Sequence, residues 1–309
     1  MVFIEFLKCF KWFFVNKYNK RYLHASADEF EQRLSKIFSA RFGYAPNFQS
    51  PKGFNEKIQW LKLYDSTPIK GMLADKYAVR SWVKEKIGEK YLIPLLGVFD
   101  KFEDIDFNKL PDKFVLKTNH ASSTNVLVKD KMKLNLFETK LKFHRWLSTN
   151  YAFKMGFELH YGLIKPKIIC EKFMGNGDLV DYKFFCFQGG VKFVWVDTGR
   201  YTNHKRNIYD LNWTEMEFTY DNYEKTDVPK PKNLDKMIEF AEKLSEGFAF
   251  VRVDFYEIEG QLYFGEMTFT SSSGMDKFHP EKYDEIVGAY LQLPNKSPLP
   301  LAEIAKIWG

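Results

Sequence analysis

The sequence predicts an α+β fold in which helices come first and antiparallel β-hairpins follow. Its 309 residues suit one large domain or two to three small packed ones, and 45% of them are hydrophobic, which is enough for a sizeable core. Helical hydrophobic spacing, broken by loops, runs to about residue 86. After Pro111, short β-rich runs separated by polar or glycine-containing turns replace it.

Composition excludes several classes of protein. Lys and Arg (46) exceed Asp and Glu (40) by six, and the two signs are interspersed, so a nucleic-acid binder is not indicated. A nucleotide, a polyanion or an anionic membrane surface fits this mild excess. Three cysteines, Cys9, Cys170 and Cys186, show no CxxC spacing and argue against a disulfide framework or a zinc site. We expect a cytoplasmic protein, because no apolar run approaches the roughly 20 residues of a membrane span.

The first 22 residues combine aromatic and basic side chains. Acidic Glu5 and the lack of a small-residue cleavage site weaken an interpretation as a signal peptide. One interpretation is a helix lying on the inner face of the membrane, and the other is a helix packed on the body or on a partner. The basic residues are Lys8, Lys11, Lys17, Lys20 and Arg21.

The helical part contains three predicted segments. The first begins with Asp28 as its N-cap and is followed by a loop at 44–53 with two prolines and one glycine. The second begins at Phe54, and residues 65–68 then break the chain. The third helix is expected over 69–86, followed by a buried strand or turn at 91–99.

The β-rich part is predicted to contain three hairpins. The first has a polar connection and the other two turn at Gln188-Gly-Gly190 and Glu259-Gly260. The strands are expected at 113–117, 126–128, 168–174, 182–187, 191–196, 250–258 and 261–267, and helices at 135–150, 234–244 and 282–308, the last with proline breaks.

The last hairpin carries charged residues in strands that are otherwise apolar. Because residues i and i+2 of a strand share a face, Arg252 points the same way as Asp254, and Glu266 the same way as Thr268. On adjacent strands, Asp254 and Glu266 would lie close enough to share a divalent cation. Hard oxygen ligands of this kind favour Mg²⁺ together with substrate phosphates. The alternative is a salt bridge of Arg252 with both acids on a solvent-facing sheet.

A polar loop, Thr118-Asn-His-Ala-Ser-Ser-Thr-Asn125, follows Lys117. Backbone N–H groups and hydroxyls can hold a phosphate there, with the lysine as a point charge. The loop contains no glycine and is therefore no P-loop, and a solvated hairpin tip is the alternative. His120 stands apart from the scattered other histidines because it lies in this loop.

A third candidate segment runs from Glu171 to Met174 and on to Asp178 and Asp181-Tyr-Lys183. A strand that ends in an apolar pair could form one wall of an adenine site, with backbone groups reading the edge of the base. A core strand with flanking surface charge is the alternative.

In their order along the chain, these features resemble the ATP-grasp fold. Five stretches within about residues 40–292 are similar to the TupA-like (teichuronopeptide biosynthesis) ATP-grasp family. The resemblance implies a nucleotide held between two α+β subdomains, with a helical region at 1–66, a lid subdomain at 67–174 and a catalytic subdomain at 175–309. The stretches are 54–64, 75–80, 114–120, 181–185 and 265–270.

The resemblance implies an ADP-forming carboxylate–amine ligase that uses ATP and Mg²⁺. ATP would phosphorylate a carboxylate, and an amine would attack the acyl phosphate to give an amide. In this family the setting is capsular or other cell-surface polysaccharide, where an amino acid is joined to a uronic acid. Members are often labelled glycosyltransferases, so a glycosyltransferase acting on a nucleotide sugar is the alternative, although the sequence offers no suitable D-x-D loop. A nucleotide-binding scaffold without turnover is a third hypothesis.

The resemblance also assigns roles to residues. Lys76 and Lys117 would meet the ATP phosphates, Arg252 would hold the transferring phosphoryl group, and the ribose would lie near Asp178. Two departures from the family are the missing loop glycines and Thr268, a weaker ligand than the usual Asn. The implied catalytic residues are Arg252, Lys117 and Lys183; the metal ligands are Asp254, Glu266 and Thr268; and the nucleotide-binding residues are Lys76, Lys117, His120, Ser122, Ser123, Glu171, Lys172, Phe173, Met174, Asp178, Asp181 and Lys183.

The acceptor side is less defined. Arg200, Lys205 and Arg206 lie in a polar stretch and could meet a nucleotide-sugar diphosphate or a carboxylate, or could belong to a solvated loop. The stretch 271–274 could close on the acyl phosphate or form a plain turn.

Overall fold

The computed structural model describes residues 2–154, 156–175, 179–200 and 202–309. Short 3₁₀ turns connect several of the regular elements. The helices are α1 (Val2–Asn19), α2 (Ala27–Phe42), α3 (Phe54–Tyr64), α4 (Pro68–Ala74), α5 (Val79–Lys86), α6 (Leu136–Leu147), α7 (Leu234–Ser245), α8 (Lys282–Tyr290) and α9 (Leu301–Trp308). The strands are β1 (Leu95–Phe99), β2 (Phe114–Thr118), β3 (Asn125–Val128), β4 (Ile168–Lys172), β5 (Asp181–Phe187), β6 (Gly190–Thr198), β7 (Lys205–Tyr209), β8 (Thr219–Tyr220), β9 (Phe250–Ile258), β10 (Gln261–Thr268) and β11 (Phe278–His279).

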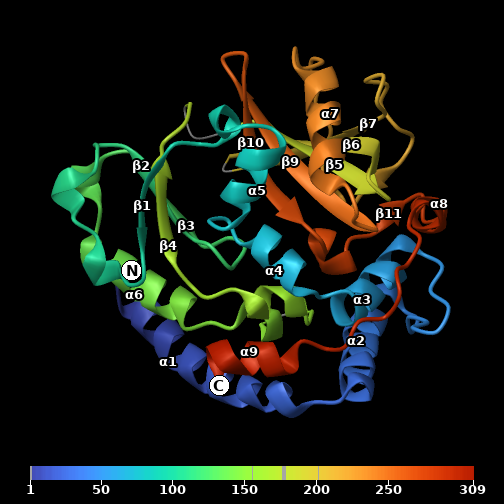
Figure 1. Ribbon diagram of the computed structural model, residues 1–309, viewed down its shortest axis with the longest axis horizontal. Coiled ribbons are helices and arrows are strands. Elements are labelled where there is room, and N and C mark those ends of the chain that lie inside the picture. The colour runs from blue at the N-terminus through green and yellow to red at the C-terminus, as the bar shows by residue number, and fades with distance from the viewer. Residues whose placement is uncertain (1, 155, 176–178, 201) are drawn as a thin grey trace.

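The described strands form two large antiparallel sheets and one small one. The four-stranded sheet has the order β1-β4-β2-β3, the five-stranded sheet has the order β10-β9-β5-β6-β7, and β8 pairs with β11. Figure 1 shows the two large sheets on opposite sides of the molecule, with α4 and α5 between them. The predicted α+β class and the three predicted hairpins are confirmed.

Both faces of the five-stranded sheet are covered, which explains why every residue of β5 is buried. Phe184 packs in a core with Met237 of α7, whereas Phe185, on the other face, packs in a core with Phe54 of α3. Strand alternation places Lys183 on the same face as Phe185. On this face of the five-stranded sheet, β5 therefore passes from an apolar core at Phe185 to a charged region at Lys183.

The four-stranded sheet packs on α6 through one face. Phe114, Leu116 and Cys170 form a core with Phe143 of that helix. The alternate residues of β2 and β4 therefore point away from α6, toward the space between the sheets. Lys117 lies among these alternate residues, so the pleat alone directs it toward the other sheet.

Three predicted elements differ in the structure. The helix expected over 69–86 is two helices, because Asp75 accepts N–H bonds from Tyr77 (2.7 Å) and Ala78 (3.2 Å) and forms a local turn that competes with the helix. Ser26, not Asp28, caps α2, since its hydroxyl accepts the N–H of Glu29 at 3.2 Å. The strand expected at 168–174 ends at Lys172.

The last helical segment is interrupted over residues 291–300, which contain three prolines, and continues in α9. Among the helices in the described part of the chain, none combines the length and the apolar character that a membrane span requires.

Candidate functional site

A cavity with two adjoining compartments lies between the two large sheets. Apolar side chains dominate one compartment; they come from the segment before β1, from β2, β3 and β10, and from the segment after β4. Charged and hydroxyl groups dominate the other compartment. The apolar compartment is lined by Arg80, Leu92, Ile93, Val115, Leu127, Glu171, Lys172, Phe173, Met174, Leu179 and Phe264; the polar one by Thr118, Ala121, Ser122, Ser123, Thr124, Asp181, Asp254 and Glu266; and both by Lys76, Lys117, Asn125, Arg200, Tyr256 and Gly265.

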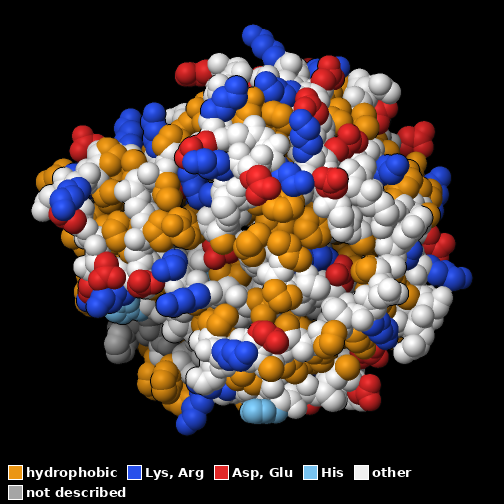
Figure 2. Space-filling view, viewed as in Figure 1, with side chains coloured by type: hydrophobic (Ala, Val, Ile, Leu, Met, Phe, Trp, Pro, Cys, Tyr) orange, Lys and Arg blue, Asp and Glu red, His pale blue; other side chains and the backbone are white. Residues whose placement is uncertain are grey.

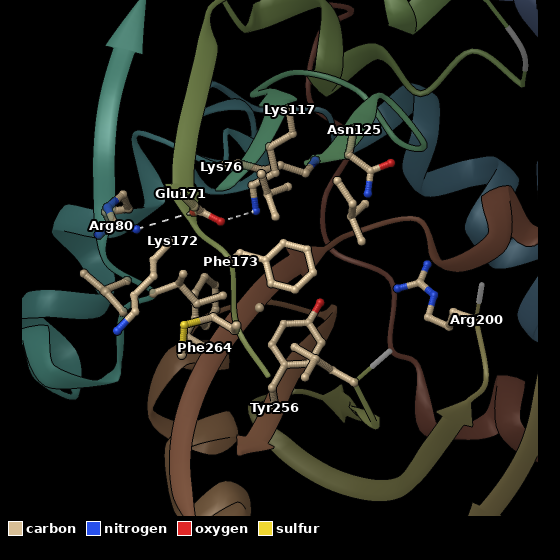
Figure 3. A pocket seen from close by; sticks show the side chains of 17 residues that line it. Lys76, Arg80, Lys117, Asn125, Glu171, Lys172, Phe173, Arg200, Tyr256 and Phe264 are labelled. Carbon is tan, nitrogen blue, oxygen red and sulfur yellow. Dashed lines mark ion pairs between the residues drawn. The ribbon is translucent and has the colours of Figure 1, made fainter. Parts of the chain in front are cut away.

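The apolar compartment is built from segments that join the two sheets. Phe173 and Met174 follow β4 directly, and Figure 3 shows the ring of Phe173 next to that of Tyr256 from β9. On the other side, Leu92 forms a parallel bridge with Phe264 of β10. These contacts leave flat apolar walls around a space that suits a planar ring.

Glu171 lies between two cations at the edge of this compartment. Its Oε2 is 2.7 Å from Nζ of Lys117, and its Oε1 is 3.7 Å from the guanidinium of Arg80 (Figure 3). The carboxylate is buried, and Lys117 also lines the polar compartment. Lys117, near the end of β2, is therefore paired with Glu171 and also borders the polar compartment.

The turn between α4 and α5 places Lys76 in the cavity. The side chain of Asn119 donates to Asp75 at 2.8 Å, and the N–H of Lys76 donates to the carbonyl of Asn119 at 3.1 Å. Nζ of Lys76 donates to the carbonyl of Ala121 at 2.9 Å and lies 4.0 Å from Glu266. Burial lowers the pKa of Lys76, and Lys117 lowers it further, while Glu266 opposes the shift. The break in the predicted helix thus serves to position this lysine.

Arg252 is the centre of the charged floor formed by β9 and β10. Its Nε and Nη2 bond both oxygens of Asp254 at 2.7 Å, as the shared strand face predicts. Nη2 also donates to Glu266 at 2.9 Å and to the hydroxyl of Thr268 at 3.2 Å, and Nη1 donates to Ser271 at 3.2 Å. The salt bridge that the sequence left as an alternative is present, but it lies against a cavity and not on an open sheet surface.

Strand β5 adds a second cation to this floor. Lys183 pairs with Asp254 across the β5–β9 register, and its Nζ is 2.8 Å from Oδ2. It also bonds Asp181, whose other cationic partner is Arg200 at 2.7 Å. Oδ1 of Asp181 is buried and has no hydrogen-bond partner within the described part of the chain. Carboxylates and cations therefore alternate along this side of the cavity.

Neighbouring charges keep Glu266 and Arg252 of this floor ionised, whereas burial raises the pKa of Asp181 although Lys183 and Arg200 oppose the shift. Burial raises the pKa of Glu266, but Lys76, Arg252, Lys183 and Arg200 together outweigh burial and hold that pKa well below its usual range. Burial lowers the pKa of Arg252, and its two carboxylate neighbours raise it above the ordinary value. Glu266 is consequently a carboxylate at any physiological pH.

A bulge brings Glu266 to this position. The β9–β10 register shifts between Phe264 and Met267, and Gly265 lies in the shift. A Cβ at Gly265 would come 3.0 Å from the carbonyl oxygen of Asp254 and 3.2 Å from the ring of Tyr256, so the strands approach closely only because the residue is glycine.

The predicted metal ligands fit Mg²⁺ in part. Asp254 and Glu266 both line the polar compartment and supply hard carboxylate oxygens. Thr268 is not part of that lining, and its hydroxyl donates to Glu266 at 3.0 Å. In residues 2–154, 156–175, 179–200 and 202–309 no three His, Cys, Asp or Glu side chains are grouped for a metal ion. The donor set suits an ion that is shared with substrate phosphates and not one held by protein alone.

The structure brings most of the predicted residues together and separates others. Arg252 and Lys183 lie behind the lining, in contact with Asp254. Asp178 lies outside the described residues. The predicted residues that line the cavity are Lys76, Lys117, Ser122, Ser123, Glu171, Lys172, Phe173, Met174, Asp181, Asp254 and Glu266.

His120 does not reach the cavity, contrary to the expectation from its loop. Its ring is fully buried near Trp308, and Nε2 is 3.2 Å from the carbonyl oxygen of Thr149. Burial lowers its pKa to about 4, so the ring is neutral at pH 7. Of the predicted polar loop, Thr118 and residues 121–125 line the cavity, whereas Asn119 and His120 are buried away from it.

Some lining residues had no assigned role in the sequence. Tyr256 follows Asp254 by two positions, so the strand alternation already placed it on the same face. Arg80 follows Lys76 by four positions, but its contact with Glu171 depends on tertiary packing. Arg200, one of the candidate acceptor residues, lines both compartments, whereas Arg206 is buried against Asp197 at 2.6 Å.

Comparison with known proteins gives one family and several distant structures. The model of the family described as TupA-like ATP-grasp matches residues 56–292. A search of curated proteins finds no match.

Solved structures similar to this chain include the D-alanine–D-alanine ligase of Bacillus anthracis complexed with ATP (17% identity, 64% of this chain and 54% of that one, TM-score 0.39). Others are the D-alanine–D-alanine ligase of Helicobacter pylori (14%, 73% and 60%, 0.42) and the L-amino acid ligase of Bacillus licheniformis (12%, 82% and 57%, 0.45). The similarity spans little more than half the length of each of these proteins.

Proposed function

This chain belongs to the TupA-like ATP-grasp family and has the ATP-grasp fold, and on that premise we propose that it is an ADP-forming ligase that joins a carboxylate to an amine. The observation that carries the proposal is the cavity between the sheets. An apolar compartment there adjoins a polar one that contains three cations and three carboxylates. ATP needs such a site, because its adenine ring requires apolar surface and its triphosphate requires cationic groups nearby.

ATP would bind with its base in the apolar compartment. Phe173, Met174 and Phe264 offer apolar surface to the ring, and the backbone after β4 can reach its polar edge. The phosphates would extend to Lys76, Lys117 and Arg200, which come from three separate segments and converge on the polar compartment. Lys117 would turn from Glu171 toward the triphosphate, a stronger anion than a single carboxylate.

The first chemical step is transfer of the γ-phosphoryl group. An oxygen of the acceptor carboxylate attacks the γ-phosphorus, the bond to the β–γ bridging oxygen breaks, and ADP leaves. Arg252 and Lys76 both lie next to Glu266, and their charge would oppose the developing negative charge; positioned charge is the main contribution a protein makes to this reaction. Asp254 and Glu266 would hold Mg²⁺, which neutralises phosphate charge when bound.

The second step forms the amide. The amine nitrogen attacks the acyl carbon, inorganic phosphate leaves, and the nitrogen loses a proton. An acyl phosphate hydrolyses in water, so the site between the sheets would have to exclude water once the substrates are bound. Ser122 and Ser123, which border the polar compartment from the loop after β2, are placed to cover it.

For the substrates, we propose a uronic acid sugar as the carboxylate and an amino acid as the amine, in capsular or other cell-surface polysaccharide biosynthesis at the cytoplasmic side of the membrane. The resemblance to the TupA-like family supports this setting. Arg200 supports it as well, because its partly exposed guanidinium at the polar compartment can meet an incoming carboxylate.

The test is a screen for ADP release. The protein is incubated with Mg-ATP and pairs of uronic acid sugars and amino acids, and the products are identified by mass spectrometry. We expect ADP, phosphate and an amide that depend on both partners. Release of AMP would contradict the reaction, and consumption of a UDP-sugar without ATP would identify a glycosyltransferase instead.

Variant enzymes connect the activity to this cavity. Glu266→Gln removes a carboxylate that lines the polar compartment, and Glu303→Gln makes the same change at an exposed position of α9. Glu266→Gln should lower ADP release at least about 100-fold, the scale of losing one electrostatic stabiliser, and Glu303→Gln should leave it unchanged.

A further inference from the structure

Helix α1 docks on the body through its polar side chains. The carboxylate of Glu5 accepts from Arg145 at 3.1 Å, and the indole N–H of Trp12 donates to the hydroxyl of Thr149. Asn16 donates to the carbonyl of Ser148 at 2.7 Å, and Asn19 to that of Phe153 at 3.1 Å. All four contacts are with α6 or the segment after it, so one face of α1 is fixed to the protein by hydrogen bonds.

The opposite face of α1 is apolar and exposed. Its residues recur at spacings of three and four, the pattern that normally marks the buried stripe of an amphipathic helix. The ring of Phe14 meets those of Phe10 and Phe13 edge to face, with centroids 5.1 and 5.7 Å apart. The stripe consists of Leu7, Phe10, Phe13, Phe14 and Tyr18, whose exposed fractions range from 50% to 65%. An exposed patch of this kind indicates an interaction surface.

Basic side chains flank and enter this stripe. Lys17 lies next to Tyr18 on α1, and Arg21 lies in the following 3₁₀ turn Lys20–His24, where its guanidinium stacks on the ring of Tyr18 at 3.6 Å. Lys8, Lys11 and Lys20 are exposed beside it. Figure 2 shows hydrophobic and basic side chains side by side at the lower left, along the part of the molecule where Figure 1 places α1.

No exposed acid balances these charges on α1. Glu5 is the only acidic residue of the sequence 2–24, and its carboxylate is buried between Lys8 and Arg145. Lys8 is paired with Glu5, so two copies of the chain that met through this stripe would bring eight other basic residues together without a counter-charge on α1. The charge pattern therefore disfavours self-association and calls for an anionic partner.

We propose that this face of α1 binds the surface of an anionic lipid bilayer, with the helix lying in the plane of the interface. The aromatic stripe would enter the boundary between headgroups and acyl chains, and the basic side chains would meet the lipid phosphates. The polar anchors to α6 explain why the helix presents its apolar side outward instead of burying it. The inference does not depend on the reaction proposed above.

The test uses the full chain in flotation with vesicles of phosphatidylcholine, with and without phosphatidylglycerol. We expect binding to the anionic vesicles that weakens as salt rises. Phe10→Ser combined with Phe14→Ser should lower the partition coefficient at least about tenfold, because each ring buries substantial apolar area. Lys17→Gln combined with Arg21→Gln should lower it roughly fivefold per lost charge.

The matched control is Ile286→Ser on α8, which removes a similarly exposed apolar side chain far from α1. It should bind vesicles as the unchanged chain does, and circular dichroism should show that all variants are folded. Three results would overturn the proposal: no flotation with anionic vesicles, equal flotation with neutral ones, or a dimer in lipid-free solution that the Phe variants dissociate.

Discussion

Two clusters of buried charge in this molecule behave in opposite ways. The cavity cluster consists of Asp181, Lys183, Arg252, Asp254 and Glu266, joined by direct ion pairs. The core cluster lies between α3 and the 3₁₀ turn Leu159–Leu163 and consists of Lys62, Glu158 and His160. Glu266 of the cavity cluster is 38% exposed, whereas all three members of the core cluster are buried.

In the core cluster, burial drives the groups toward neutrality. Burial lowers the pKa of Lys62 to about 7 against the opposing charge of Glu158, and Nζ donates to Gln59 at 2.8 Å. Burial raises the pKa of Glu158, which accepts the hydroxyl of Thr270, and lowers that of His160 to about 3. In the cavity cluster, by contrast, neighbouring cations hold the pKa of Glu266 low.

Burial of a charged group therefore does not by itself identify a functional site. Four cations around Glu266, at the edge of a cavity, preserve the ionised form that phosphate chemistry needs, whereas Asp181, buried deeper in the same cluster, has a raised pKa. Without such pairing, desolvation removes the charge, and the group becomes part of the core. The following experiments test whether the cavity cluster is needed for activity and the core cluster is not.

The largest effect should come from Asp254→Asn in the cavity cluster. The change keeps the shape but removes the charge that Arg252 and Lys183 share, so ADP release should fall at least about 100-fold. Asp235→Asn, at an exposed position of α7, is the matched control. Activity within about tenfold of the unchanged enzyme would show that the cluster serves structure and not chemistry.

Lys117→Met should have the next largest effect. Without its ammonium group the polar compartment loses one of three lining cations, and ATP should bind about tenfold more weakly in calorimetry, the scale of one charge-assisted hydrogen bond. Lys113→Met, at an exposed site just before β2, should bind ATP normally. Unchanged affinity in the Lys117 variant would mean that this lysine stays with Glu171 when the nucleotide binds.

Lys62→Met in the core cluster should change turnover less than about threefold. Methionine has a similar volume, and burial already raises the pKa of Glu158 toward its neutral form, so the change removes one hydrogen bond to Gln59 and leaves no strong unpaired charge. The free energy of unfolding should therefore fall by less than about 3 kcal/mol. Urea denaturation measures the shift. A loss of activity as large as that of Asp254→Asn would show that the core cluster is needed for activity as much as the cavity cluster is.

The last effect leaves turnover unchanged and is a pH dependence that Lys62 imposes on stability. Its pKa is about 7 in the folded protein and 10.5 in ordinary surroundings, so between these values the unfolded chain binds a proton that the folded chain lacks. Stability therefore rises with pH in that window, by at most about 1.4 kcal/mol per unit, and is constant below it. Lys62→Met should lose this slope, and an unchanged slope would assign it to another group.

Local patterns predicted much of the fold and part of the site. Strand alternation placed Arg252 and Asp254 on one face, because the side-chain period of a strand does not depend on its neighbours. Phe173 and Met174 were predicted as the apolar end of a strand over 168–174; they follow β4, which ends at Lys172, and both line the cavity.

Tertiary contacts decided what local patterns could not. The bulge at Gly265 and the turn at Asp75 change the direction of a strand and a helix, and neither alters the hydrophobic period enough to be seen. His120 is polar and lies in a polar loop, but packing near Trp308 buries it. For α1, the spacing predicted a helix and left its surroundings open; the structure shows that it packs on the body through its polar side.

The close approach of β9 and β10 at Gly265 limits which substitutions the chain tolerates. Nearby lining residues can be shortened at the cost of a little empty volume, but this position can only be enlarged, and the first added carbon already meets a backbone oxygen and an aromatic ring. A search for variants with altered substrate range would therefore do best to vary the surrounding side chains and to keep this residue fixed.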